Sequence, residues 1–164
     1  MEQKHPVKFV YSGIPLRRFS VLEFRGYNLA PELLVKLDLL AVRWRDETQK
    51  GISVSTDSGA IGREDRGKSQ HCFGTYFEVR AIDIFPHITT LAEAIRFSEL
   101  SVECGFTGIG VYPEASPSVM FHLDVRRDRD PLNPADWGAK RSTDKKNSWE
   151  YISFDAALEL LPVR

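Results

Sequence analysis

Two histidines of this chain stand near acidic residues, in stretches typical of β-strands and of the turns that lead into them. His71 belongs to Ser69-Gln70-His71, which runs on to Asp83, and a second histidine lies in Phe121-His122-Leu123-Asp124-Val125. Neutral imidazole and carboxylate groups bind zinc, and a catalytic zinc site keeps three protein ligands and one water molecule. We therefore expect the two stretches to meet and to hold one Zn2+ ion.

The remaining histidines and the cysteines give weaker signals. His5 lies near the N-terminus and His87 follows a proline. Cys72 and Cys104 are too few for a disulfide framework or for a closed zinc site built on cysteine, and we expect both to be reduced thiols. Any single histidine is more often a core or surface residue than a metal ligand, so the histidine spacing alone is a weak signal.

Apolar periodicity predicts two long helices and one short one. The first begins at Pro31, a residue suited to the first helical turn, and runs to about Thr48. The second begins at a capping box, Thr90 to Glu93, and Gly105 follows its end, while a third spans about residues 153–161. The expected buried side chains are Leu33, Leu34, Leu37, Leu40, Ala41 and Trp44 in the first helix, and Leu91, Ala94, Ile95, Ser98 and Val102 in the second.

Strands are predicted where β-branched, aromatic and small residues alternate with polar ones. Glu78 and Asp83 fall on opposite faces of one of these strands, so only one of them can face the metal of His71. The predicted strands cover residues 51–56, 75–85, 107–112 and about 119–126.

Length and composition indicate one globular domain over residues 1–164, with 42% hydrophobic and 27% charged residues. Residues 1–30 are expected to form an irregular N-terminal arm, and residues 128–150 a long polar loop with a short helix at 134–137. The net charge of −1 argues against a basic field for nucleic acid, and no stretch approaches the roughly 20 apolar residues of a membrane-spanning helix. The glycine-rich loop of residues 58–68 lacks the ending of a phosphate-binding loop.

The motifs together resemble those of a family of zinc peptidases. Ser69-x-His71, Ala81-x-Asp83 and the late His122-x-Asp124 are similar to the signature Ser-x-His-x-x-Gly-x-Ala-x-Asp and the later zinc histidine of the D-alanyl-D-alanine carboxypeptidases and L-alanyl-D-glutamate endopeptidases. These enzymes cleave peptidoglycan and share a core with the hedgehog signalling domain. The likeness covers about residues 31–127, and phage and bacterial members also resemble the hairpin that begins Gly108-Ile109-Gly110-Val111-Tyr112-Pro113.

The resemblance implies a ligand set but leaves its acid open. It implies that His71, Asp83 and His122 bind zinc and that Ser69 makes a supporting hydrogen bond. The signature has its aspartate seven residues after the histidine, which is Glu78 here, whereas the Ala-x-Asp ending matches Asp83 five residues later. Glu78 therefore stays the alternative ligand.

The general base departs from the family pattern. Many members carry an acid three residues before the last histidine, and that position is Val119 here. The nearest replacement is Asp124, either as the general base or as an acceptor that orients His122. A third arrangement has Asp124 as the ligand and His122 as the base.

The reaction implied by the resemblance is zinc hydrolysis of a peptide bond. The metal acidifies its water and polarises the carbonyl group, an acid takes the water's proton and passes it to the leaving amine, and a cation stabilises the oxyanion or anchors a substrate carboxylate. Arg63 is the implied cation, with Arg80 and Arg126 as alternatives.

These inferences combine into one expectation. The fold is α+β, with a small antiparallel sheet that carries the zinc site, flanked by two main helices and long loops, as in the hedgehog/DD-peptidase fold. The expected function is a zinc-dependent peptidoglycan peptidase acting on the stem peptide, and the alternatives are an inactive metal- or cell-wall-binding module and a virion protein with a structural metal. Because no signal peptide is evident, we expect cytoplasmic synthesis, followed by release to the cell wall or carriage on a virion.

Overall fold

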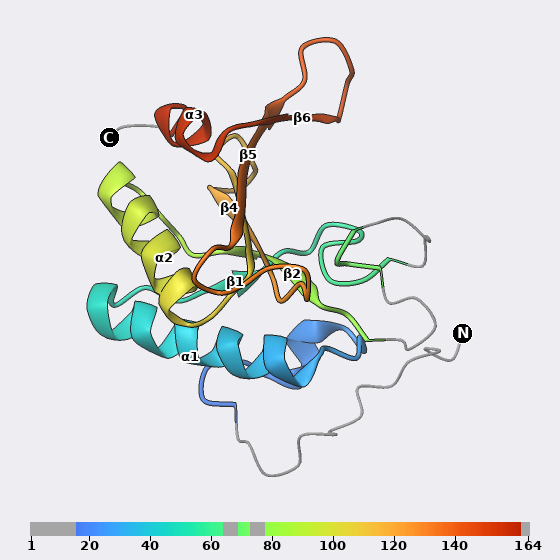
Figure 1. The fold of residues 1–164 in the computed structure, drawn as a ribbon, viewed down its shortest axis with the longest axis vertical. Coiled ribbons are helices and arrows are strands. Elements are labelled where there is room, and N and C mark those ends of the chain that lie inside the picture. Colours follow the sequence, from blue (N-terminus) through green and yellow to red (C-terminus); the bar gives the residue numbers. More distant parts are fainter. Residues whose placement is uncertain (1–15, 64–68, 73–77, 162–164) are drawn as a thin grey trace.

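The computed structural model describes residues 16–63, 69–72 and 78–161. These residues form one six-stranded sheet with helices packed on one of its faces (Figure 1). The predictions for His5, for residues 64–68 of the glycine-rich loop and for residues 75–77 of a strand lie outside the described residues. The predicted α+β class is confirmed for the part of the chain that the structure describes.

The sheet is mixed, which corrects the prediction of an antiparallel sheet. Its strand order is β1-β2-β4-β3-β5-β6, and all neighbours are antiparallel except β3 and β5, which run parallel. The strands are β1 (Ser53–Val54), β2 (Ala81–Phe85), β3 (Gly108–Tyr112), β4 (Met120–Asp124), β5 (Ala135–Arg141) and β6 (Trp149–Ile152). The helices are the 3-10 helix η1 (Val21–Phe24), α1 (Pro31–Thr48), α2 (Leu91–Glu103) and α3 (Phe154–Glu159).

The parallel pair arises from the path of the chain after β4. Residues 125–134 pass the start of β3, where the Ala135 N–H donates a hydrogen bond to the Thr107 carbonyl oxygen at 2.9 Å. From there β5 adds to the free edge of β3 and runs in the same direction. An antiparallel addition would have required the connection to reach the far end of β3 first.

The hairpin of β5 and β6 takes up much of the stretch predicted as a long polar loop over residues 128–150. The predicted short helix at 134–137 overlaps the start of β5. The prediction was wrong because the charged residues here form cross-strand pairs. Lys140 forms an ion pair with Glu150 at 3.3 Å, and the guanidinium of Arg141 lies 4.2 Å from the ring centre of Trp149. Such pairs stabilise an exposed hairpin even where the local composition is polar.

The described part of the N-terminal arm is more regular than predicted. Ser20 and Glu23 form a capping box that opens η1, with a hydrogen bond of 2.7 Å from the Ser20 N–H to the Glu23 carboxylate. Phe19 and Phe24 on either side of this box are buried in the main core and anchor the arm to it. The prediction of an irregular arm is therefore wrong at residues 21–24, which form a 3-10 helix.

The predicted helix α1 is confirmed with its bounds and with its six apolar residues that were expected to be buried. Asp38 is buried as well, which was not predicted, and it accepts hydrogen bonds from the Arg17 and Arg18 N–H groups. The helix α2 begins after Thr90 as predicted but buries a different face. Phe97 is fully buried between the rings of Trp44 and Phe121, with centroids 5.0 and 4.9 Å away, whereas Leu91 and Ile95 are 39% and 42% exposed. Two apolar stripes overlap on this helix, and the stripe with the larger aromatic side chain packs inward.

The sheet has one helix-covered face and one polar face. Residues such as Ile84, Val111 and Phe121 alternate along their strands towards the helices and are fully buried in the main core. The intervening residues point the other way, because side chains alternate along a strand. Asp83 and His122 belong to this second set and lie directly opposite each other in the β2–β4 register. The strand register therefore brings two of the three predicted metal ligands together.

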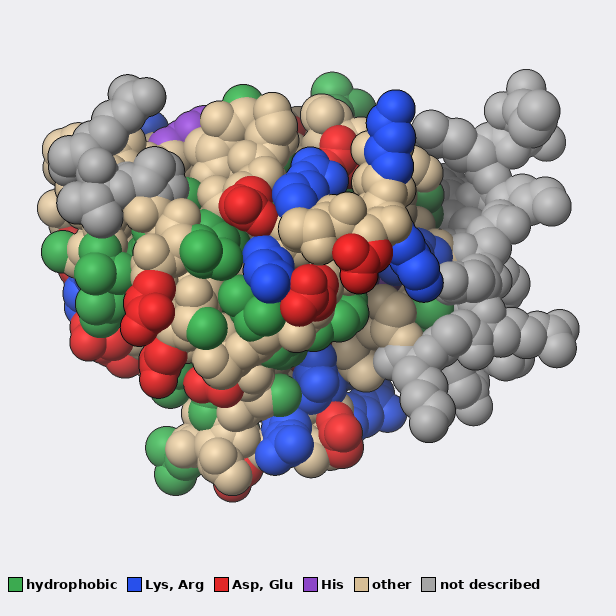
Figure 2. All heavy atoms as spheres, turned by 90° about the horizontal axis from the view of Figure 1, so that it is seen from above, with side chains coloured by type: hydrophobic (Ala, Val, Ile, Leu, Met, Phe, Trp, Pro, Cys, Tyr) green, Lys and Arg blue, Asp and Glu red, His purple; other side chains and the backbone are tan. Residues whose placement is uncertain are grey.

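Charge is mixed on the surface of the molecule. Figure 2 shows acidic and basic side chains next to one another over the centre of one face, in keeping with the net charge of −1. Within the described ranges, none of the helices has the length and apolar composition needed to cross a membrane.

Candidate metal centre

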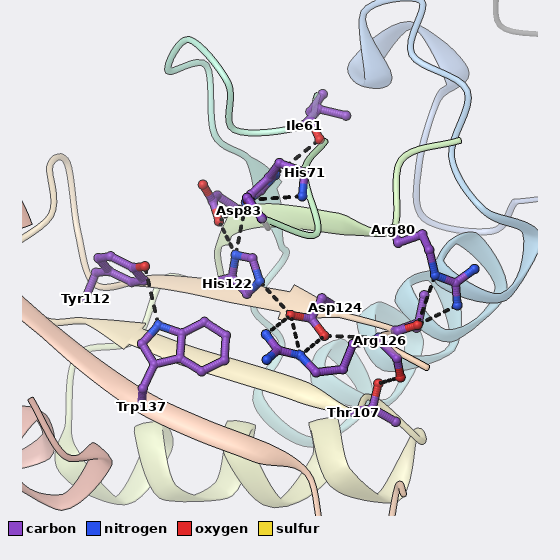
Figure 3. A network of polar contacts seen from close by, with 12 residues as sticks. Ile61, His71, Arg80, Asp83, Thr107, Tyr112, His122, Asp124, Arg126 and Trp137 are labelled. Atoms are coloured by element: carbon purple, nitrogen blue, oxygen red, sulfur yellow. Dashed lines mark hydrogen bonds and ion pairs between the residues drawn. The ribbon is translucent and has the colours of Figure 1, made fainter. Parts of the chain in front are cut away.

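His71, Asp83 and His122 form a buried group that could hold a metal ion (Figure 3). One donor atom from each residue lies within 4.8 Å of the others, and all three residues are at most 9% exposed. His122 Nδ1 lies 3.0 Å from both His71 Nε2 and Asp83 Oδ1, and His71 Nε2 lies 3.3 Å from the same carboxylate oxygen. The fold thus brings together the three predicted ligands, although they are far apart in the sequence.

Hydrogen bonds on the outer edges of both imidazole rings fix their orientation. His71 Nδ1 lies 3.2 Å from the carbonyl oxygen of Ile61, and His122 Nε2 lies 2.9 Å from Asp124 Oδ2. Both partners are acceptors, so each of these ring nitrogens carries the proton in the neutral imidazole. When both rings are neutral, the inner nitrogens, His71 Nε2 and His122 Nδ1, therefore present lone pairs to each other and to Asp83. An inner nitrogen donates a hydrogen bond to Asp83 only when its ring is protonated.

Three acceptors that face one another need a positive charge between them. Burial alone would raise the pKa of Asp83, but hydrogen bonds from His122 and His71 lower it to about 2, so this carboxylate is ionised at neutral pH. Buried ionised groups are stable only when paired or bound to a cation. The donor set of two imidazoles and one carboxylate therefore fits a divalent metal ion, and a proton takes its place in the metal-free protein.

The structure decides between the two candidate acids. Asp83 is on β2, opposite His122, and its carboxylate contacts both histidines. Glu78 precedes β2, and its carboxylate pairs with Arg80 at 3.4 Å. Asp83 is the acid of the group, and the alternative ligand Glu78 lies outside it.

A turn and a loop position His71, which is on no strand. The Ser69 hydroxyl oxygen accepts a hydrogen bond from the His71 N–H at 3.3 Å, so Ser69 makes a hydrogen bond of the kind expected of it. The Arg63 N–H donates to the His71 carbonyl oxygen at 3.0 Å, which ties this turn to the loop that carries Ile61. The same loop thus supplies both the backbone contact and the carbonyl that orients the ring.

Asp124 lies behind His122, on the side away from Asp83. It is fully buried, and its carboxylate accepts hydrogen bonds from His122 Nε2 and from the guanidinium of Arg126, whose Nε lies 2.9 Å from Oδ1. Burial would raise the pKa of Asp124, but Arg126 and His122 hold it below its usual range. Such a carboxylate orients the imidazole and makes it more basic.

This placement bears on the other two roles expected of Asp124. The carboxylate is on the wrong side of the ring to take a proton from a molecule bound between the three ligands, so the general-base role does not fit. The arrangement with Asp124 as ligand and His122 as base does not fit either, because His122 Nδ1 faces the other two donors. Val119, the position of the base in the family pattern, is buried in the main core.

Two glycines in β3 make room for the site. A Cβ atom on Gly108 would lie 2.2 Å from Asp124 Oδ1, and one on Gly110 would lie 2.5 Å from the indole of Trp137. These distances are far below van der Waals contact, so a side chain at either position would displace a residue of the site. The sequence showed the glycines, but only the strand register explains why they are there.

A pocket of about 500 Å³ opens beside the three ligands. Arg63 and Arg126 are both in its wall, whereas Arg80 is paired with Glu32 and Glu78 elsewhere. Sequence reasoning missed the aromatic part of the wall, which comes from β3, β5 and β6. If β5 and β6 had been predicted, the alternation of side chains along these strands would have placed most of these aromatic residues on the pocket side of the sheet. The aromatic residues are Tyr112, Trp137, Trp149 and Tyr151.

Comparisons of the chain with models of protein families, with curated proteins and with solved structures find no match. The chemistry of the site therefore has to be argued from its own residues.

Removal of one ligand should abolish stoichiometric metal binding. We expect His71→Ala to lose the bound metal, because two donors remain of three, while Glu78→Gln keeps it. Metal content of both purified proteins, by inductively coupled plasma mass spectrometry, distinguishes them. Equal metal content in His71→Ala and wild type would contradict the site.

Loss of the orienting carboxylate should weaken the site without destroying it. We expect Asp124→Asn to reduce metal affinity by about 10- to 100-fold, because the His122 ring loses its charged partner. Asp46→Asn, the same change at an exposed position of α1, is the matched control and should leave the affinity unchanged. Chelator competition measures both values, and an unchanged affinity in Asp124→Asn would be the contrary outcome.

Metal affinity should rise with pH. Burial would lower the pKa of His122, but hydrogen bonds to Asp124 and Asp83 raise it to about 9 in the metal-free protein. Below that pH a metal ion must displace a proton, so the affinity should increase by about tenfold per pH unit. Titration in weak buffer at pH 7 should show proton release on binding, and a pH-independent affinity between pH 6 and 8 would refute the expectation.

Proposed function

We propose that this chain is a zinc-dependent peptidoglycan peptidase with a hedgehog/DD-peptidase-like fold, which hydrolyses a peptide bond of the stem peptide or cross-link. The observation that carries the proposal is the convergence of His71, Asp83 and His122 beside an open pocket. These are the residues through which the sequence resembles the peptidase family. The proposal requires that the protein reach the cell wall, after release from the cytoplasm or on a virion.

Zinc is the metal that this donor set favours. Catalytic zinc sites use three nitrogen or oxygen ligands from the protein and leave a fourth position open, and two histidines with one carboxylate are a known set. Sites for magnesium or calcium are built mainly from oxygen ligands. A zinc ion bound here would supply the Lewis acid that acidifies a water molecule and polarises a carbonyl group.

The chain's own residues would bind and orient the substrate around that position. Arg63 and Arg126 both line the pocket, and a guanidinium group of either residue would anchor a substrate carboxylate there. Arg126 is held in place by Asp124 and by the Trp137 ring, whose centre lies 5.1 Å from the guanidinium carbon. The charge of this arginine is therefore fixed in position before any substrate binds.

The pocket also favours anionic substrates by its total charge. The two guanidinium groups offset the carboxylates of Asp83 and Asp124, so a bound divalent ion leaves the site positive. Stem peptides carry free carboxylates, which such a site attracts. This argument applies equally to carboxypeptidase and endopeptidase cleavage.

One observation favours a second function, that of an inactive metal- or cell-wall-binding module. In the described part of the pocket wall, Asp83 is the one carboxylate, and it is already engaged with both histidines. The position of the family's general base is occupied by Val119, which carries no acidic group and is buried in the main core. A protein that kept the metal site and lost the base would bind the stem peptide without cleaving it.

Hydrolysis of purified peptidoglycan tests the proposal. We expect the zinc-loaded protein to release new amino groups, detected by amine labelling and by mass spectrometry of the products, and the cleaved bond would be read from those masses. His71→Ala should release none, and Glu78→Gln should match wild type. A zinc-loaded, folded wild-type protein that sediments with peptidoglycan and releases no amines would replace the peptidase with the binding module.

A further inference from the structure

Tyr112 is a polar residue of the pocket that the roles given above do not use. It ends β3 on the same face as the metal ligands, and it lies two residues beyond Gly110, which pairs with His122 across the sheet. Its side chain lines the pocket with Asp83 and His122, although the residue is only 8% exposed. The phenol thus lies on the wall of the cavity in which a substrate would bind.

Two aromatic neighbours fix the Tyr112 ring. Trp149 packs edge-on against it, with ring centroids 5.0 Å apart and planes at 87°. Trp137 approaches with its indole Nε1, which donates a hydrogen bond to the Tyr112 oxygen at 3.5 Å (Figure 3). The same indole packs against His122, with ring centroids 5.0 Å apart. Trp137 therefore sets the position of the hydroxyl relative to the metal ligands.

The hydrogen bond from Trp137 also determines what the hydroxyl can do. An indole N–H is only a donor, so the Tyr112 oxygen accepts this bond and the hydroxyl keeps a proton that it can donate, with the Tyr151 side chain beside it in the pocket wall. Burial raises the pKa of Tyr112, so the phenol keeps this proton at neutral pH. The pocket wall thus presents a neutral, oriented hydrogen-bond donor beside the metal site.

We propose that Tyr112 is a catalytic residue whose hydroxyl donates a hydrogen bond to the substrate carbonyl oxygen as that oxygen becomes negatively charged. This inference rests on the proposed function. When water adds to the carbonyl carbon, the electron pair of the C=O double bond moves onto that oxygen, and a preoriented donor stabilises it. The pair then returns, the C–N bond breaks, and the departing nitrogen takes up the proton that the water lost. Tyr112 keeps its own proton throughout.

Tyr112→Phe tests the assignment, because it removes the hydroxyl and keeps the ring that packs on Trp149. With muropeptides released from peptidoglycan by a muramidase as substrate, we expect kcat to fall by about 100-fold, the effect typical of losing one oxyanion donor. KM and zinc content should stay at wild-type values. Tyr27→Phe, the same change outside the pocket, is the matched control and should keep the wild-type kcat.

A binding measurement gives a readout that does not depend on turnover. A phosphinate analogue of the cleaved dipeptide carries negative oxygens in a tetrahedral group, and Tyr112→Phe should bind it more weakly by a factor similar to the loss in kcat. A variant with wild-type kcat, with a raised KM alone, or with lost zinc would overturn the role of Tyr112. An inactive wild-type enzyme would overturn the proposed function itself, and this inference with it.

Discussion

The arrangement of the site depends on three electron-pair donors that face one another across a few ångströms. Two imidazole nitrogens and one carboxylate oxygen meet in a buried position, and each would repel the others without a positive charge between them. The rings cannot rotate to relieve this repulsion, because their outer nitrogens are hydrogen-bonded to the Ile61 carbonyl oxygen and to the Asp124 carboxylate. The three donors are therefore stable together only with a cation between them, and this is the physical reason for proposing a metal ion at this position.

The register of the sheet places two of these three donors. Asp83 and His122 face each other because β2 and β4 are paired antiparallel with these residues opposite. The next strand, β3, contributes Gly108 and Gly110, whose missing side chains leave room for Asp124 and Trp137. The helices pack on the other face, so the ligands and their pocket stay accessible to a substrate. The main core and the candidate metal centre thus lie on opposite faces of one sheet.

The sequence allowed the helix α1, the polar–apolar alternation of β4 and the metal trio to be predicted, because each leaves a periodic or chemical pattern. It did not allow Asp83 to be separated from Glu78, since that choice depends on where β2 begins and on its register with β4. The roles of Asp124 were open for a similar reason, because spacing alone does not show which edge of the His122 ring a carboxylate contacts. The β5–β6 hairpin was missed because its charged residues pair across strands.

The central claim is that one metal ion binds between His71 Nε2, Asp83 and His122 Nδ1. Crystals of the protein soaked in zinc, measured on both sides of the zinc absorption edge, test it most directly. We expect one strong anomalous peak bonded to these three groups, with Asp124 still hydrogen-bonded to His122 Nε2. A peak at His122 Nε2, a peak elsewhere, or no peak between the three residues would contradict it.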